Sequence, residues 1–307
     1  MVFLNEYICC LKINAGNAML TTTEILKRVR HIEIKTRGLS NHIFAGEYHS
    51  AFKGRGMSFS EVREYAPGDD IKFIDWNVTA RFSHPFVKVF EEERELTVML
   101  LVDVSGSSLF GTHERLKRDL ITEISAVLSF SAATNNDKVG VIFFSDKVEK
   151  FIPPKKGRSH ILRIIRELIA LEPAPKNGTN IRVALEYLNQ VLKKKTITFL
   201  MSDFISEPYE QALQLSARKH DLVGIQVYDK MDRDLPEAGL IQLADAETGN
   251  VRWIDTDDKT IRMQYAHSFE QHKKYCVQAF RKSGAQLMSV RTDADYVKEL
   301  QTFFKAR

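Results

Sequence analysis

The feature that most constrains the fold is an alternation of short apolar runs with longer amphipathic segments, from residue 96 to the C-terminus. The first run, Leu96 to Val104, is almost continuously apolar, which is typical of a strand buried on both faces of a sheet. Segments with helical periodicity separate most of the later runs, and helical crossovers of this kind join parallel strands. The alternation therefore predicts an α/β fold with an open, mostly parallel, doubly wound sheet.

The positions of the expected elements follow from the same periodicities. Strands are expected at 96–104, 138–144, 196–202, 222–228 and 286–290. Helices are expected at 114–134, 159–171, 180–192, 209–219, 259–282 and 294–305. Two further runs, 240–244 and 251–254, flank a turn that contains Gly249 and predict a hairpin at the edge of the sheet.

The chain before residue 96 has a different texture. Residues 24–37 have the period of an amphipathic helix with a basic face, whereas 46–94 are punctuated by Gly and Pro. That stretch predicts a module with short strands at 71–76 and 86–90 and a helical period at 59–65. Residues 1–18 lack an amphipathic repeat and are expected to be a disordered extension. We therefore divide the chain into this extension at 1–18, a smaller helix-plus-short-strand module at 19–95 and the α/β domain at 96–307.

Composition narrows the class of protein. The 44 basic and 40 acidic side chains give a net charge of +4, which is too balanced for nucleic-acid binding by bulk charge. The 3 cysteines lack metal-ligand spacing and argue against both a disulfide framework and a zinc site. No run approaches the roughly 18 apolar residues of a membrane-spanning helix. We expect a cytoplasmic protein with no transmembrane segment and no nucleic-acid partner.

Hard oxygen ligands gather where the expected strands and helices end. Asp103, Ser105 and Ser107 follow the first strand, Asp203 follows a later strand, and Thr179 lies in the turn before a helix. Each of these residues alone is also a common turn or cap residue. However, ligands of open α/β sheets bind beyond the carboxyl ends of the strands, so these side chains are expected to meet there. Hydroxyl and carboxylate oxygens favour Mg²⁺ or Mn²⁺ over zinc or copper, with Ca²⁺ less favoured.

The order of these residues resembles the metal-ion-dependent adhesion site of von Willebrand factor A domains, whose motif is D-x-S-x-S, then Thr, then Asp. The resemblance implies that Ser105, Ser107 and Thr179 bind the ion directly, and that Asp103 and Asp203 hold it mainly through water. An ion with few carboxylate ligands keeps positive charge and an open position, which favours an incoming Glu or Asp. The implied function is metal-dependent binding of a protein partner, without catalysis.

A second set of motifs runs directly into the first strand of the α/β domain. It includes Gly54-Arg55-Gly56, Glu61 to Tyr65, Pro67 to Asp70, Ile74-Asp75-Trp76, Thr79-Ala80-Arg81 and Glu91 to Arg94. This string resembles the hallmark of the bacterial family called domain of unknown function 58. The resemblance implies a von Willebrand A-like protein that works with a MoxR-type AAA+ ATPase in the assembly or maturation of an unidentified client protein.

The charged residues of this string have two interpretations. They could form ion pairs that tie the module to the sheet domain, with Trp76 packing as an anchor, or they could form a contact surface for the ATPase. The residues concerned are Arg55, Arg63, Asp69, Asp75, Trp76 and Arg81.

Four common enzyme motifs are missing from the places where this sequence would carry them. An aspartate-nucleophile phosphatase needs a second acid two residues after the first, where this chain has Ser105. Neither G-x-G-x-x-G after a strand nor G-x-x-x-x-G-K-[ST] occurs, and Ser105 is not in a G-x-S-x-G context. The sequence therefore predicts a protein that is not an enzyme. A metal-assisted hydrolase that uses the same ion remains the leading enzyme alternative.

Overall fold

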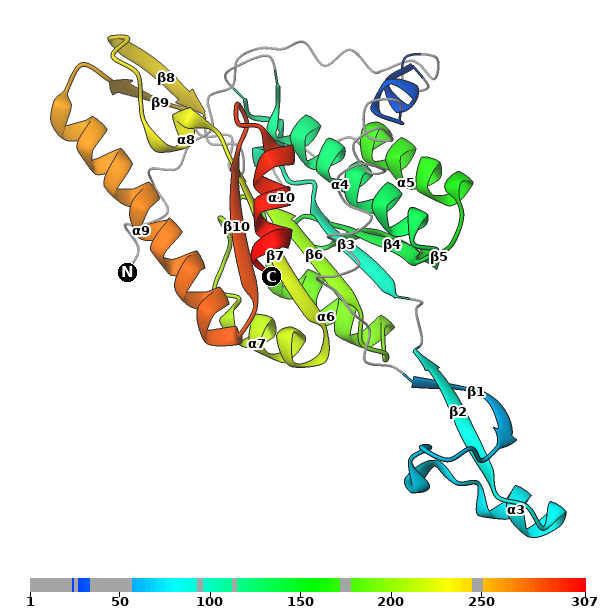
Figure 1. Ribbon diagram of the computed structural model, residues 1–307. Coiled ribbons are helices and arrows are strands. Elements are labelled where there is room, and N and C mark those ends of the chain that lie inside the picture. The colour runs from blue at the N-terminus through cyan, green and yellow to red at the C-terminus, as the bar shows by residue number, and fades with distance from the viewer. Residues whose placement is uncertain are drawn as a thin grey trace. The chain divides into compact units, whose positions relative to one another are not determined.

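The computed structural model describes Glu24 and residues 27–33, 57–92, 96–111, 115–171, 178–244 and 251–307 (Figure 1). The chain forms two compact units, Phe52–Leu96 and Met1–Ala51 with Thr97–Arg307. We call the first the hairpin module and the second the sheet domain. The expected extension at 1–18 lies outside the described residues.

The sheet domain is built on six strands in the order β10-β7-β6-β3-β4-β5. All neighbouring strands are parallel except β5, which pairs antiparallel with β4. The α/β class with a mostly parallel sheet is therefore confirmed. The strands are β3 (Thr97–Asp103), β4 (Lys138–Phe144), β5 (Val148–Lys155), β6 (Ile197–Ser202), β7 (Asp221–Tyr228) and β10 (Gln286–Arg291).

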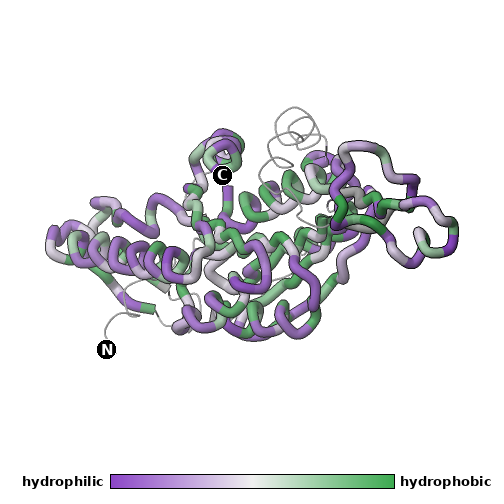
Figure 2. Tube along the Cα trace, turned by 60° about the horizontal axis from the view of Figure 1, so that its bottom comes forward, coloured by the Kyte–Doolittle hydropathy of each residue, from purple (hydrophilic) through white to green (hydrophobic). Residues whose placement is uncertain are grey.

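Helices cover both faces of this sheet, so its central strands are buried on both sides. On one face α6, α7 and α9 pack on a core that includes Leu101 and Leu200. On the other face Ser125 of α4 contacts Met201, and Phe304 of α10 stacks edge-on against Phe199. The helices are α4 (Lys117–Thr134), α5 (Arg158–Ala170), α6 (Ile181–Val191), α7 (Glu210–Lys219), α9 (Lys259–Ser283) and α10 (Tyr296–Ala306). Figure 2 shows hydrophobic residues concentrated in the sheet, whereas α9 is largely hydrophilic.

The helical residues 27–33 belong to the sheet domain because of their packing. Val29 is buried against Ile161 and Ile165 of α5, and Glu33 forms an ion pair with Arg158. The apolar side of the predicted amphipathic helix therefore faces α5.

Two features of the sheet differ from the prediction. β5 was not predicted, because it carries Pro153 and Pro154, which are tolerated only in an edge strand such as this one. The hairpin of β8 (Leu240–Ala244) and β9 (Val251–Asp255) was placed correctly, but it forms a separate sheet of two strands and is not an edge of the main sheet. Leu243 of this hairpin packs on Tyr265 of α9. The short helix α8 (Lys230–Arg233) precedes the hairpin in the chain.

The hairpin module consists of β1 (Met57–Glu64), η2 (Ile71–Phe73), α3 (Trp76–Phe82) and β2 (Phe86–Glu92). The strand expected at 86–90 is confirmed, but the helix at 59–65 and the strand at 71–76 are wrong. Residues 59–64 instead pair antiparallel with β2. The chain turns helical at Trp76 because the Asp75 carboxylate accepts hydrogen bonds from the amides of Asn77 and Val78.

None of the helices in the described part of the chain is both long enough and apolar enough to cross a membrane.

Candidate metal centre

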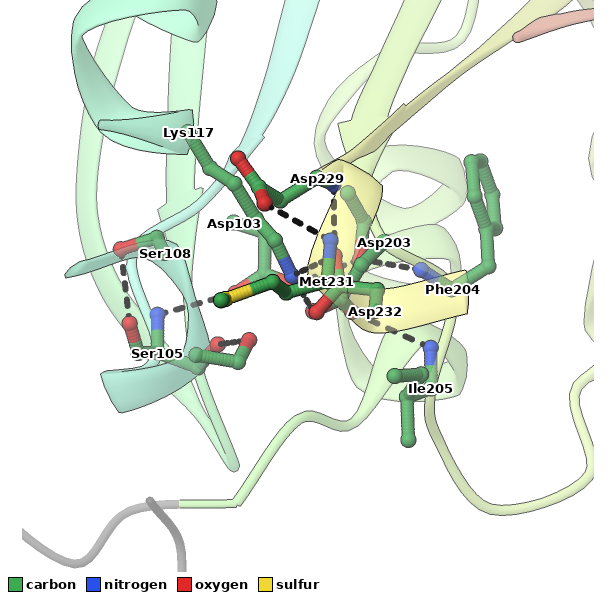
Figure 3. Close-up of polar contacts among 12 residues, drawn as sticks. Asp103, Ser105, Ser108, Lys117, Asp203, Phe204, Ile205, Asp229, Met231 and Asp232 are labelled. Atoms are coloured by element: carbon green, nitrogen blue, oxygen red, sulfur yellow. Dashed lines mark hydrogen bonds and ion pairs between the residues drawn. The ribbon is translucent and has the colours of Figure 1, made fainter. Parts of the chain in front are cut away.

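The candidate site lies where two neighbouring parallel strands end. Asp103 is the last residue of β3, and Asp203 directly follows β6. The two strands pair in parallel, with Val102 opposite Met201, so their carboxyl ends meet at one edge of the sheet. The structure therefore brings Asp103 and Asp203 together, as the sequence predicted (Figure 3).

The loop after β3 folds back so that its hydroxyls face one another. The Asp103 Oδ1 accepts a hydrogen bond of 2.9 Å from the Ser105 amide, and the Ser108 hydroxyl donates to the Ser105 carbonyl at 2.7 Å. A turn of 3₁₀ helix at Gly106–Leu109 completes the loop. As a result, the Ser105 and Ser107 hydroxyl oxygens lie 3.0 Å apart, and both side chains are buried.

Thr179 reaches the same sheet edge from the start of α6. The amide of the next residue, Asn180, donates to the carbonyl of Ser145, directly after β4, at 2.7 Å. β4 pairs with β3, and just beyond β3 the Val104 amide donates a hydrogen bond of 2.9 Å to the Phe144 carbonyl. The start of α6 is therefore tied to the strand next to the one that carries Asp103. Thr179 is only 6% exposed, and its hydroxyl has no hydrogen-bond partner among the described residues. A buried hydroxyl without a partner costs about 1–3 kcal/mol, and an ion held by hydroxyl oxygens would supply that partner.

The two carboxylates of the site repel each other. Burial raises the pKa of Asp103, and the negative charge of Asp203 adds a smaller increase, so that the pKa is about 6. The Ser202 hydroxyl, which donates to Asp103 Oδ2 at 2.5 Å, opposes this shift because it stabilises the ionised form. A divalent cation would stabilise both carboxylates in their ionised form. The donor set of hydroxyls and carboxylates fits Mg²⁺ or Mn²⁺.

Lys117 is a member of the site that the sequence analysis missed. Its side chain is buried, and its Nζ lies 2.7 Å from Asp232 Oδ2 and 3.5 Å from Asp203 Oδ2. The only available signal was a lysine in the first turn of a predicted helix, where the helix dipole disfavours positive charge.

Phe204 was also missed, although it determines how the chain leaves the site. Its φ of 64° lies in the left-handed region, which a residue other than glycine rarely adopts. The Phe204 amide donates to the Ser202 hydroxyl at 3.0 Å, and its ring packs edge-on against Phe280 at 5.3 Å. This buried packing holds the unusual backbone immediately after Asp203.

The other residues singled out in the sequence lie in the hairpin module. Arg63 donates two hydrogen bonds, of 2.8 and 2.7 Å, to Asp69, and its guanidinium holds the pKa of Asp69 below its usual value. Asp75 caps α3 and pairs with Lys88 at 3.3 Å. These ion pairs are local to the module. Arg55 lies outside the described residues.

Trp76 does not pack inside the module, because its side chain is 68% exposed at the first position of α3. Its role as an anchor toward the sheet domain stays a prediction. Arg81 lies in the last turn of the same helix and is also exposed.

Across the described residues, no group of three or more His, Cys, Asp or Glu side chains is arranged to hold a metal ion. The candidate centre therefore depends on the hydroxyls of Ser105, Ser107 and Thr179.

The sequence profile of the family described as "Protein of unknown function DUF58" matches residues 61–275. The chain belongs to this family. It is 30% identical over 281 residues to the uncharacterized protein Rv1480 of Mycobacterium tuberculosis, covering 91% of this chain and 88% of that protein.

Solved structures similar to this DUF58 chain include the conserved hypothetical protein BatB from Bacteroides thetaiotaomicron, with a TM-score of 0.45 and 16% identity. That match covers 69% of this chain and 98% of BatB. Another is proximal thread matrix protein 1 from the mussel byssus, solved with a zinc-occupied MIDAS motif, with a TM-score of 0.39 and 16% identity. It covers 69% of this chain and 46% of the mussel protein.

Proposed function

We propose that the sheet domain is a von Willebrand A-like, metal-dependent protein-binding domain. In this proposal Ser105, Ser107 and Thr179 bind Mg²⁺ or Mn²⁺, and Asp103 and Asp203 support the ion mainly through water. The single observation that carries the proposal is the buried Thr179 hydroxyl, which has no partner in the part of the chain that the structure describes. It lies at the sheet edge where the Ser105 and Ser107 hydroxyls are 3.0 Å apart.

The chemistry of these ligands favours binding over catalysis. Neutral hydroxyl ligands leave the ion with positive charge, so a carboxylate from a partner protein is its natural additional ligand. Among the described residues, the Ser105 and Ser107 hydroxyls bond each other and no histidine nitrogen, so neither is paired with a base. A metal-assisted hydrolase is the enzyme alternative, and a turnover screen with phosphoesters and peptides separates the two.

The partner side of the proposal rests on the family resemblance. We propose that a MoxR-type AAA+ ATPase acts with this domain in the bacterial cytoplasm, and that a client protein supplies the acidic side chain. Co-purification from the native host with Mg²⁺, repeated with a chelator, tests this directly. The client should be lost with the chelator. A client retained without divalent ions would contradict the bridging role of the metal.

Calorimetry tests the ion site itself. Wild-type protein should bind Mg²⁺ or Mn²⁺, and Asp103→Ala should bind it far more weakly because the supporting charge is lost. Ser131→Ala is the matched control, since Ser131 is buried on α4 and is not part of the site. At a free ion concentration of about 100 times Kd, the ion should stabilise the fold by roughly 2.7 kcal/mol. Equal affinity in Asp103→Ala and wild type would contradict the site.

A further inference from the structure

The burial of Lys117 is unfavourable on its own. The residue is 1% exposed and occupies the first position of α4, where the helix dipole repels a positive charge. Removing an ammonium group from water is also costly unless the charge is paired. The compensation comes from two buried carboxylates, those of Asp203 and Asp232, and from the Phe110 ring, whose centroid lies 5.5 Å from Nζ.

The position of the Lys117 ammonium is fixed by the backbone of the neighbouring helix. Asp232 Oδ2, which lies 2.7 Å from Lys117 Nζ, also accepts a hydrogen bond of 2.7 Å from the Asp229 amide. Asp229 is itself held by Thr292, whose hydroxyl donates to Asp229 Oδ2 at 2.6 Å. Figure 3 shows Lys117 reaching from α4 toward Asp203 and Asp232. The charge is therefore anchored beside Asp203.

Both oxygens of Asp203 are engaged inside the protein. Oδ2 lies 3.5 Å from Lys117 Nζ, and Oδ1 accepts a hydrogen bond of 3.2 Å from the Ile205 amide. A metal ion bound directly to Asp203 Oδ2 would lie beside the Lys117 ammonium, and the two cations would compete for the same oxygen. Lys117 also adds one positive charge beside the ion site, which weakens cation binding and favours anion binding.

We propose that Lys117 is a positioning residue that sets the specificity of the metal centre. It keeps Asp203 from binding the ion directly, so that the ion remains weakly neutralised and depends on a carboxylate from the partner. This inference rests on the proposed metal site. It adds that the ion and the acidic partner bind cooperatively, and that Lys117 is the residue responsible.

The test uses Lys117→Met in the full chain, at pH 8, with Mn²⁺ as the ion and acetate as the carboxylate probe. Calorimetry measures the Mn²⁺ affinity, and water-proton relaxation measures how much acetate is needed to displace water from bound Mn²⁺. Lys117→Met should bind Mn²⁺ at least about fivefold more tightly, because a nearby positive charge is lost and Asp203 is released. Lys117→Met should require more acetate to displace water from bound Mn²⁺. The bound ion should also carry one water molecule fewer, because the Asp203 carboxylate takes its place.

Two controls separate this role from a general effect of charge or folding. Lys147→Met removes an exposed lysine and should leave both affinities unchanged. In Lys117→Met/Asp203→Asn the gain in Mn²⁺ affinity should disappear, because it requires the Asp203 carboxylate. A purely structural role of Lys117 would lower the Mn²⁺ affinity instead of raising it.

If Lys117→Met does not fold, Asp232→Asn gives the opposite test. It removes the partner at 2.7 Å and leaves Lys117 to Asp203 alone, so Mn²⁺ should bind more weakly and acetate more tightly. Unchanged affinities in Asp232→Asn, or no gain in a folded Lys117→Met, would overturn the role of Lys117 while leaving the metal site intact. Failure of the wild-type protein to bind Mn²⁺ would overturn the metal site itself.

Discussion

At the scale of single residues, the Thr179 side chain separates a metal role from a structural one. Its hydroxyl has no partner within the described ranges, so no hydrogen bond there depends on it. Thr179→Val removes the hydroxyl and keeps the shape. We expect the ion-free protein to keep or raise its Tm, and the Mn²⁺ affinity to fall at least about tenfold, which corresponds to about 1.4 kcal/mol. Calorimetry and thermal unfolding measure the two effects.

Thr122→Val is the control for Thr179→Val. Thr122 lies on α4, and its hydroxyl donates to the Arg118 carbonyl at 2.8 Å. The control should therefore lose stability without losing Mn²⁺ affinity. If Thr179→Val kept full Mn²⁺ affinity, Thr179 would not be a ligand.

A second residue-scale prediction concerns pH. His220 is buried, and its Nδ1 lies 2.9 Å from the Thr196 hydroxyl. No residue that the structure describes is a hydrogen-bond partner of its Nε2. Burial, with a smaller effect of Lys219, lowers the pKa of His220 from 6.5 to about 4. The folded protein therefore resists protonation that the unfolded chain accepts, and stability is lost as pH falls from 6.5 toward 4.

His220→Gln should reduce this loss. Between pH 7 and pH 4.5 its Tm should fall by at least about 2 °C less than that of wild type. His160 and His272, whose pKa values are also lowered by burial, keep part of the acid sensitivity in both proteins. Parallel Tm curves for the variant and wild type would show that His220 does not contribute.

At the scale of helices and strands, Arg118 adds hydrogen bonds to the apolar contact between α4 and α5. Its guanidinium donates to the Leu168 and Ile169 carbonyls at 2.9 Å each, and also to Leu171. The last carbonyls of a helix have no partner within the helix, so Arg118 of α4 caps the C-terminus of α5. Arg118→Met should destabilise the fold by about 1–3 kcal/mol in denaturant unfolding. Arg166→Met, on the exposed side of α5, should change stability by less than about 0.5 kcal/mol. Equal losses in the two variants would contradict the capping role.

The sequence predicted the sheet-domain elements better than those of the hairpin module, and the reason is physical. A run such as that of β3 is buried on both faces, so its apolar pattern is unmistakable. In the module, the helix Trp76–Phe82 begins at the cap residue Asp75. Asp75 lies inside the run 71–76, whose residue pattern is typical of a strand, so the start of the helix was not predicted.

In the site, chain order indicated the five proposed ligands and supports. Lys117 and Asp232 could not be paired from sequence, because they are 115 positions apart and only the fold brings Lys117 Nζ within 2.7 Å of Asp232 Oδ2.

At the scale of the whole molecule, the hairpin module is small and only marginally stable by itself. Among residues 61–89, whose side chains are described, only Val87 is buried and apolar. A unit of this size buries only a small share of its surface, so its stability without further support is marginal. Residues 93–95 connect it to β3 without Gly, Pro or Ser. We therefore expect the full chain to unfold in one calorimetric transition, and limited trypsin digestion to spare residues 86–100. Two transitions, or rapid cleavage there into two stable fragments, would contradict this prediction.

We propose above that hydroxyl oxygens at one edge of the sheet hold a divalent ion. The most direct measurement is an anomalous difference map from crystals of the wild-type protein grown with Mn²⁺. We expect one peak within bonding distance of the Ser105, Ser107 and Thr179 hydroxyls, with water between the ion and Asp203. A map with no peak at these hydroxyls, in crystals where Mn²⁺ is bound elsewhere or not at all, would contradict the claim.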